Sequence, residues 1–234
     1  MRDPQFVVGD ATKLQLPDSC VDLVVTHPPY VGVDTKRYGG KSEDQINHDS
    51  KKFMKLLLKA SREMERVLTD RGSIWICVGG TDTIGFEYIT EVLKATDLKL
   101  AGWVHWDYAT QPNQERLGQE HNIWFHLMKS DLYFNPFTIK RYHTNTWSIP
   151  TNNAGNLVDS FMETEGHFMA DAMPEAIPAR LIEMFSKPGD VVLDPFGGTG
   201  VTAVQAWKAG REGISIDISP EQQKIAKKRF EYSQ

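Results

Sequence analysis

The strongest constraint on the fold is a strand-like run that leads directly into a glycine-rich turn. Residues 191–200 read Val-Val-Leu-Asp-Pro-Phe-Gly-Gly-Thr-Gly, which is an apolar run followed by an acid and three glycines. Glycines let the backbone turn sharply and approach a ligand closely. A helix that begins after them leaves unpaired N–H groups at its first turn. The pattern predicts a strand-to-helix turn that faces a small ligand, although an ordinary tight turn would share its local composition.

A second acid favours a nucleoside as that ligand. The next strand-like run, residues 213–216, ends at Asp217. An acid at the end of the second strand of such a unit can accept hydrogen bonds from both ribose hydroxyls. A dinucleotide site is the first alternative, but its Gly-x-Gly-x-x-Gly fingerprint is incomplete because residues 201–203 after Gly200 supply no third glycine. The pattern therefore argues against a dehydrogenase.

Apolar, β-rich runs alternate with amphipathic patterns on both sides of an aromatic, turn-rich stretch. This alternation predicts a single α/β domain, residues 1–234, with a mainly parallel sheet and helices on both faces. The predicted strands are 5–8, 21–26, 73–78, 99–106, 122–128, 190–193 and 213–216, and the predicted helices are 50–68, 174–185, 200–209 and 220–231.

Composition and charge exclude several classes of protein. No apolar run approaches 18 residues and no signal-peptide pattern is present, so we expect a soluble cytoplasmic protein with no membrane partner. Cys20 and Cys77 are far apart and form no zinc-type pair, so we expect no metal. The 26 Lys and Arg against 31 Asp and Glu give a net charge of −5. Any nucleic acid must therefore be held by a local basic surface.

A second motif follows the predicted strand at residues 21–26. It reads Thr26-His27-Pro28-Pro29-Tyr30. The two prolines stop the strand, so the Pro28 carbonyl is not tied up in a continuing ladder and stands beside an aromatic side chain. A Pro-Pro-Tyr tripeptide alone more often forms a plain turn. It indicates a functional site only together with the glycine motif.

The two motifs together resemble those of S-adenosylmethionine-dependent DNA amino-methyltransferases. Residues 194–200 are similar to motif I, commonly Asp-Pro-Phe-x-Gly-x-Gly, and the second motif resembles Asp/Asn/Ser-Pro-Pro-Tyr. The resemblance implies methyl transfer from S-adenosylmethionine to an exocyclic amine of adenine or cytosine. His27 replaces the usual Asp, Asn or Ser, and a neutral imidazole still accepts one hydrogen bond. The resemblance implies four catalytic residues, His27, Pro28, Pro29 and Tyr30. His27 and the Pro28 carbonyl orient the amine, and Tyr30 stacks on the flipped base.

The catalytic motif precedes the cofactor motif, which indicates a circularly permuted, Rossmann-like methyltransferase fold of the β group. This resemblance covers residues 5–80 and 165–230. Asp10 would lie near the cofactor adenine unless it only forms an Asx turn, and a capping or linker role for His167 is equally compatible with the pattern. The implied cofactor-binding residues are Asp10, Ala11, Thr26, His167, Asp194, Pro195, Phe196, Gly198, Gly200 and Asp217.

Residues 103–164 fall where the family inserts its target-recognition region. Their aromatic side chains are individually more typical of a core, whereas Asn, Gln and Arg suit base edges. Residues 31–47 form a predicted loop over the target base. The predicted DNA-binding residues are Lys36, Arg37, Lys41, Gln111, Asn113, Gln114 and Arg116. A basic face of the helix at 50–68 is either a further DNA contact or a solvated surface; it carries Lys52, Lys55, Lys59, Arg62 and Arg66.

The sequence is compatible with several functions. The absence of the Asp typical of adenine enzymes favours N4 of cytosine over N6 of adenine as the target. Methylation of RNA or of a protein glutamine is a second enzymatic alternative, although those enzymes normally have the unpermuted order. A catalytically silent DNA-binding relative is a third. We expect double-stranded DNA as the partner, while a homodimer and a cognate restriction endonuclease are left open.

Overall fold

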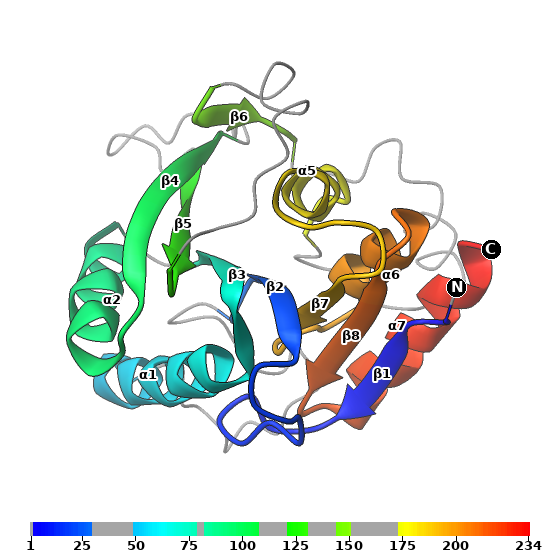
Figure 1. Cartoon of the computed structure of the whole chain (residues 1–234), viewed down its shortest axis with the longest axis horizontal. Coiled ribbons are helices and arrows are strands. Elements are labelled where there is room, and N and C mark those ends of the chain that lie inside the picture. Colours follow the sequence, from blue (N-terminus) through cyan, green and yellow to red (C-terminus); the bar gives the residue numbers. More distant parts are fainter. Residues whose placement is uncertain (1, 30–48, 79–81, 108–120, 131–143, 151–172) are drawn as a thin grey trace.

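The computed structural model describes residues 2–29, 49–78, 82–107, 121–130, 144–150 and 173–234. These residues form a sheet with the strand order β1-β8-β7-β2-β3-β5-β4-β6 (Figure 1). The strands are β1 (Gln5–Val8), β2 (Val21–Thr26), β3 (Leu68–Cys77), β4 (Lys99–Asp107), β5 (His121–Met128), β6 (Thr146–Ser148), β7 (Val191–Asp194) and β8 (Glu212–Asp217). The helices are α1 (Ser50–Val67), α2 (Asp82–Ala95), α5 (Ala176–Phe185), α6 (Val201–Lys208) and α7 (Pro220–Tyr232).

The sheet is mainly parallel and joins the two ends of the chain. Strands β1, β8, β7, β2 and β3 run parallel, while β5 is antiparallel to both β3 and β4. The N-terminal strand β1 pairs with β8, with Val8 opposite Asp217. Because β1 completes the sheet next to strands from the far end of the sequence, the structure confirms the predicted circularly permuted, Rossmann-like α/β fold.

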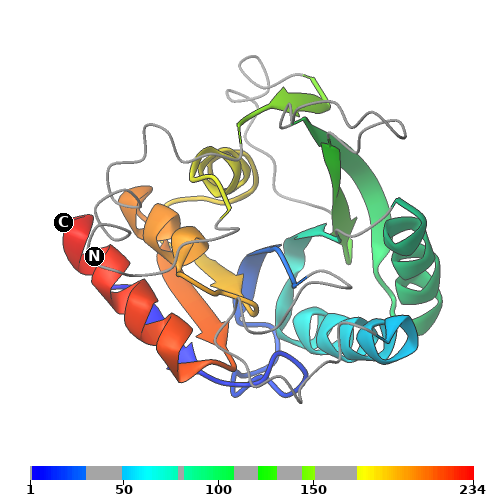
Figure 2. The same ribbon diagram turned by 180° about the vertical axis from the view of Figure 1, so that it is seen from behind.

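Helices cover both faces of the sheet (Figures 1 and 2). On one face, α1 and α2 bury residues such as Phe53, Leu57 and Tyr88 against Ile74 of β3. On the other face, α5 buries Ile177, Leu181 and Phe185 against β2 and β3. Helix α7 packs beside α6, with the Trp207 and Phe230 ring centroids 5.1 Å apart. The apolar spacing that predicted α1 is confirmed, because its periodic residues face this core.

Two elements were not predicted from the sequence. Helix α2 contains Gly85, a poor helix former, yet an added Cβ there would lie 3.2 Å from Phe125 Cε2, so the glycine permits close packing of α2 on β5. Strand β6 is three residues long and buries only Trp147. Strand β3 also begins earlier than predicted, at Leu68.

Part of the region expected to recognise the target belongs to the central sheet. Residues 103–107 lie in β4, and β5 and β6 also fall within residues 103–164. Trp106, Trp124 and Trp147 are buried in the core, which agrees with the interpretation that single aromatics are core residues. Trp103 differs from these buried residues, because its exposed fraction is 46%.

The strand order reverses next to β7. On one side, β7 pairs with β8, which follows it in the sequence. On the other side, β7 pairs with β2, which comes from the N-terminal part of the chain. In open α/β sheets, ligands bind at the carboxyl ends of the strands where the order reverses. The ends of β7 and β2 are therefore the expected place for the site, and they carry the two sequence motifs.

Candidate active site at the ends of β7 and β2

A buried hydrogen bond joins the two motifs. The Thr26 hydroxyl donates to Asp194 Oδ1 at 2.7 Å. The same carboxylate accepts the Thr202 hydroxyl at 2.9 Å and the Phe196 N–H at 3.1 Å. Asp194 is only 4% exposed, and burial raises its pKa to about 6, although the hydrogen bonds from Thr26 and Thr202 lower it. At neutral pH the carboxylate is therefore ionised and holds β2, β7 and α6 together.

This arrangement adds a structural role to the one predicted for Thr26 and Asp194. Both side chains were expected to bind the cofactor, but both are buried and hydrogen-bonded to protein groups. Their observed contacts hold the ends of β2 and β7 together, and the contact with the cofactor stays a prediction. Pro195 is also buried, whereas Phe196 is half-buried.

The glycine turn has one open position. Gly200 has a φ of 77°, and an added Cβ would lie 2.7 Å from the Ala226 Cβ of α7, so this glycine serves packing within the protein. Gly198 has a φ of 46°, and an added Cβ would meet nothing nearer than the Phe196 carbonyl oxygen at 4.0 Å. The outer side of the turn at Gly198 is therefore open to a ligand.

Asp217 lies beside this turn at the end of β8. Its Oδ2 accepts the Gly198 N–H at 2.9 Å and its Oδ1 accepts the Ser219 N–H at 2.8 Å. Burial raises the pKa of Asp217, and the N–H groups of Ser219 and Gly198 oppose that shift. Each carboxylate oxygen retains acceptor capacity after one hydrogen bond. The residues present therefore fit the ribose of a nucleoside cofactor.

Asp10 and Ala11 follow β1 next to Asp217. The Gly9 N–H donates to the Asp217 carbonyl at 2.9 Å, which places the start of this segment against β8. Asp10 Oδ1 accepts both the N–H and the hydroxyl of Thr12 at 2.8 Å, so the alternative Asx turn is present. Asp10 is nevertheless exposed, and Ala11 is buried.

His27 stands against two indole rings at the end of β2. Its ring centroid is 5.8 Å from that of Trp124 and 6.2 Å from that of Trp106. Burial lowers the pKa of His27 to about 4. The imidazole is therefore neutral at neutral pH and one ring nitrogen has an acceptor lone pair. Pro28 is buried and Pro29 is half-buried.

Several predicted site residues lie outside the described residues. They are Tyr30, Lys36, Arg37, Lys41, Gln111, Asn113, Gln114, Arg116 and His167. The roles assigned to them stay predictions.

The basic face of α1 consists of Lys51, Lys52, Lys55, Lys59 and Arg62, which are all exposed. Arg66, which the sequence placed on this face, does not belong to it. Its guanidinium donates to the carbonyls of Leu14 and Leu16 and to Glu63, at 2.9 to 3.0 Å, and it also binds Asp18. Arg66 therefore anchors the segment before β2, a role that helical spacing alone does not reveal.

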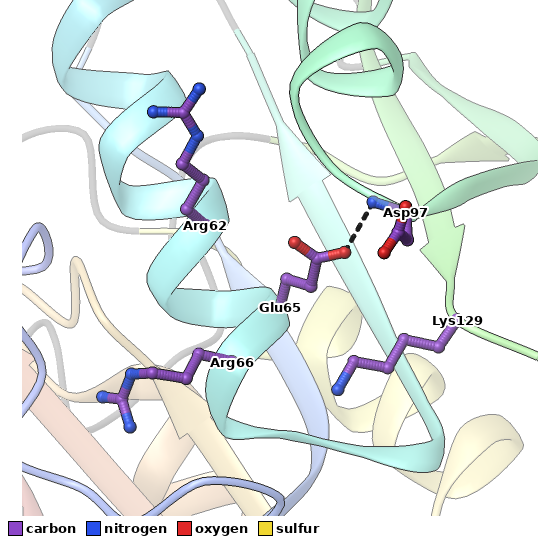
Figure 3. A pocket seen from close by; sticks show the side chains of 5 residues that line it. All are labelled: Arg62, Glu65, Arg66, Asp97 and Lys129. Carbon is purple, nitrogen blue, oxygen red and sulfur yellow. Dashed lines mark hydrogen bonds between the residues drawn. The ribbon is translucent and has the colours of Figure 1, made fainter.

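A polar pocket lies at the opposite end of the sheet, near the start of β3 (Figure 3). It is lined by Arg62, Glu65, Arg66, Asp97 and Lys129. Glu65 accepts the Asp97 N–H at 2.7 Å, and Lys129 donates to the Leu68 carbonyl at 2.6 Å. The first bond joins α1 to the turn before β4 and the second joins the end of β5 to the start of β3, so Glu65 and Lys129 stabilise the fold here.

Ile218 and Thr202 were not among the site residues predicted from the sequence. Ile218 directly follows Asp217 and is 76% exposed, which is unusual for a large aliphatic side chain beside a candidate ligand acid. Its position after the acid was a usable signal. Thr202 reaches Asp194 from the first turn of α6, and only the fold brings this pair together.

Two features are absent from the described residues. In that part of the chain no helix is both long and apolar enough to cross a membrane. The same residues contain no group of three His, Cys, Asp or Glu side chains able to share a metal ion.

Comparison with known proteins gives consistent matches. The chain is 28% identical to Type II methyltransferase M.SmaI of Serratia marcescens, over 98% of this chain and 91% of that protein. The PvuII DNA methyltransferase, named as cytosine-N4-specific, superposes with a TM-score of 0.83 at 19% identity and covers 98% of this chain and 87% of its own.

A third match was solved with the cofactor. TTHA0409 of Thermus thermophilus, in complex with S-adenosyl-L-methionine, has a TM-score of 0.74 at 24% identity and covers 98% of this chain and 94% of its own. The family model described as DNA methylase matches residues 21–228, and it therefore spans both motifs. The chain thus belongs to the DNA methylase family, whose members transfer the methyl group of S-adenosylmethionine to N6 of adenine or N4 of cytosine in DNA.

Proposed function

We propose that this protein methylates N4 of cytosine in double-stranded DNA, with His27 and the Pro28 carbonyl as the two acceptors for the target amine. The observation that carries the proposal is the hydrogen bond of 2.7 Å between Thr26 and Asp194. It fixes the residue before His27 to the first residue of the glycine turn. The group that receives the base and the turn that faces the cofactor are thereby held at adjacent strand ends.

The chemistry requires oriented acceptors because an exocyclic amine is a poor nucleophile. Its lone pair is delocalised into the ring, and positive charge develops on nitrogen as it attacks a methyl group. Hydrogen-bond acceptors aimed at the two amine hydrogens orient the lone pair and stabilise that charge. When bound, S-adenosylmethionine supplies the methyl group.

His27 suits the acceptor role in its neutral form. The pKa of about 4 keeps the proton off the imidazole at neutral pH, so it places an acceptor rather than a cation near the amine. Pro28 adds a carbonyl in a segment where neither Pro28 nor Pro29 has an N–H. We propose cytosine rather than adenine because His27 stands where adenine enzymes typically have Asp.

The nucleoside part of the cofactor has a separate set of residues in this proposal. Asp217 accepts from the ribose hydroxyls, and the exposed side chain of Ile218 offers an apolar surface to the adenine ring. Asp10, with its exposed carboxylate, lies at the end of the neighbouring strand. DNA would reach this edge of the sheet from the carboxyl ends of the strands.

The modified base identifies the reaction directly. Unmethylated plasmid DNA is incubated with the protein and with cofactor that carries a trideuterated methyl group, and the digested nucleosides are analysed by mass spectrometry. We expect labelled N4-methyl-deoxycytidine. Labelled N6-methyl-deoxyadenosine would instead show the adenine reaction. No labelled nucleoside, from protein that binds the cofactor, would identify a silent DNA-binding relative.

A further inference from the structure

Arg229 is a buried charge on the last helix. The exposed positions of α7 include Lys224 and Lys227, whereas the Arg229 side chain has an exposed fraction of 0%. A buried guanidinium is costly unless it is paired and hydrogen-bonded. Its partners therefore indicate what Arg229 does in the fold.

Among the described residues, Arg229 has partners on two other segments. Arg229 Nε donates to the Thr199 carbonyl at 2.9 Å, and Nη2 donates to the Thr199 hydroxyl at 3.4 Å. Nη1 lies 3.5 Å from Glu175 Oε1, at the start of α5. Glu175 also lies 3.7 Å from Lys208 Nζ. Arg229 thus connects α7, the glycine turn and Glu175, the N-cap residue of α5.

The glycine turn is held on two sides. Asp217 accepts the N–H of Gly198, and Arg229 binds the carbonyl of the following residue, Thr199. Ala226 lies one turn before Arg229. A Cβ added to Gly200 would lie 2.7 Å from the Ala226 Cβ, so α7 packs closely on this glycine. Helix α7 therefore sets the path of this turn through one packing contact and one charged group.

The position of the turn explains why its path matters. Strand β7 lies between β8, which carries Asp217, and β2, which leads to His27. A ligand that reaches from Asp217 toward His27 must cross the end of β7, where residues 195–200 turn. The half of the ligand beyond the ribose therefore faces the segment that Arg229 fixes.

We propose that Arg229 is a positioning residue that holds the Thr199 carbonyl and thereby shapes the turn for the methionine half of S-adenosylmethionine. The inference rests on the proposed function, because it concerns the same cofactor site. Two residues then contribute to different parts of the affinity for S-adenosylmethionine. Asp217 contributes to the nucleoside half, and Arg229 contributes to the half that crosses β7.

The test compares two ligands by calorimetry without DNA. S-adenosylmethionine contains both halves, whereas 5′-methylthioadenosine lacks the methionine chain beyond sulfur. Arg229→Met should raise the Kd for S-adenosylmethionine at least about tenfold and leave the Kd for 5′-methylthioadenosine within about twofold. Lys227→Met, on the exposed side of the same helix, is the matched control and should change neither value.

Equal losses for both ligands, or no loss in a folded Arg229→Met protein, would overturn the inference. If Arg229→Met does not fold, Glu175→Gln provides the second variant, with Lys208→Met as its control. Glu175→Gln removes the ion pair and should weaken only the longer ligand, by about threefold; an unchanged Kd for that ligand would contradict the role of Arg229. Failure of the unsubstituted protein to bind S-adenosylmethionine would contradict the proposed function instead.

Discussion

Thr26 and Asp194 lie 168 positions apart in the sequence, yet the hydroxyl of one donates to the carboxylate of the other at 2.7 Å. Thr26 precedes His27, and Asp194 begins the glycine turn. The bond therefore ties the group expected to hold the target amine to the turn expected to hold the cofactor. Because both side chains are buried, this link is part of the protein's own scaffold and forms before any ligand binds.

Removal of the Thr26 hydroxyl should slow methyl transfer more than it weakens cofactor binding. Thr26→Val keeps the side-chain shape but deprives Asp194 of one donor, which costs about 1–3 kcal/mol for a buried group. We expect the single-turnover rate constant to fall about tenfold. Thr202→Val removes a different donor from the same carboxylate and loses only a long contact of 3.4 Å to the Val25 carbonyl of β2. Equal slowing in both variants would show that the effect is general to Asp194.

Asp217→Ala should weaken cofactor binding before any DNA is present. The substitution removes the acceptor proposed for the ribose hydroxyls, and charge-assisted hydrogen bonds contribute about 1.5–3 kcal/mol each. In contrast to Arg229→Met, this variant should lose affinity for S-adenosylmethionine and for 5′-methylthioadenosine alike. Calorimetry with both ligands on the folded variant measures this. Unchanged affinity for both ligands would contradict the assignment of Asp217 as the residue that binds the ribose.

The basic face of α1 should contribute to DNA affinity and to its salt dependence. Lys55 and Lys59 are both exposed on that face. The double variant Lys55→Gln/Lys59→Gln should reduce the slope of log affinity against log salt by about 1.8, since each phosphate contact contributes about 0.9. Lys224→Gln/Lys227→Gln on α7 has the same charge change and should leave the slope unaltered. Identical slopes in all three proteins would mean that the α1 face is only solvated.

His126 should make the protein less stable in acid. It is stacked on Trp75 with ring centroids 4.4 Å apart, and burial lowers its pKa to about 3. The unfolded chain protonates this histidine at about pH 6.5. Between pH 7 and pH 5 the unfolded state therefore takes up a proton that the folded state does not, and about 2 kcal/mol of stability is lost.

His126→Phe should remove this contribution. Denaturant unfolding at pH 7 and at pH 5 should show a loss of stability about 2 kcal/mol smaller than in the unsubstituted protein. His27 also has a lowered pKa, but it is present in both proteins, so the difference between them reports His126. Parallel losses in the two proteins would show that His126 is protonated in the fold.

The sequence predicted the architecture well because its signals are local. The glycine turn, the strand that ends at Asp217 and the proline stop after Thr26 each determine the backbone over a few residues, and their order along the chain predicted the permuted sheet. Helix α2 was missed because Gly85 lowers its local propensity, while its fit against Phe125 depends on a distant strand.

The site was less predictable where long-range contacts decide the role of a residue. Asp194 looks like a ligand acid in the sequence, and only the approach of Thr26 and Thr202 shows that it also joins β2, β7 and α6. Arg66 and Arg229 look like surface charges at helical spacing, but both bind backbone carbonyls of other segments. The low pKa of His27 likewise depends on its burial beside Trp106 and Trp124, which come from strands far along the chain.

Single-turnover methyl transfer by His27 variants tests the central claim most directly. With DNA and cofactor saturating, His27→Asn keeps an acceptor and should transfer within about tenfold of the unsubstituted protein. His27→Phe removes the acceptor and should be slower by a factor of at least about 100, while calorimetry shows unchanged affinity for S-adenosylmethionine. A His27→Phe protein that methylates DNA as fast as the unsubstituted protein would contradict the assignment of His27 as an acceptor for the target amine.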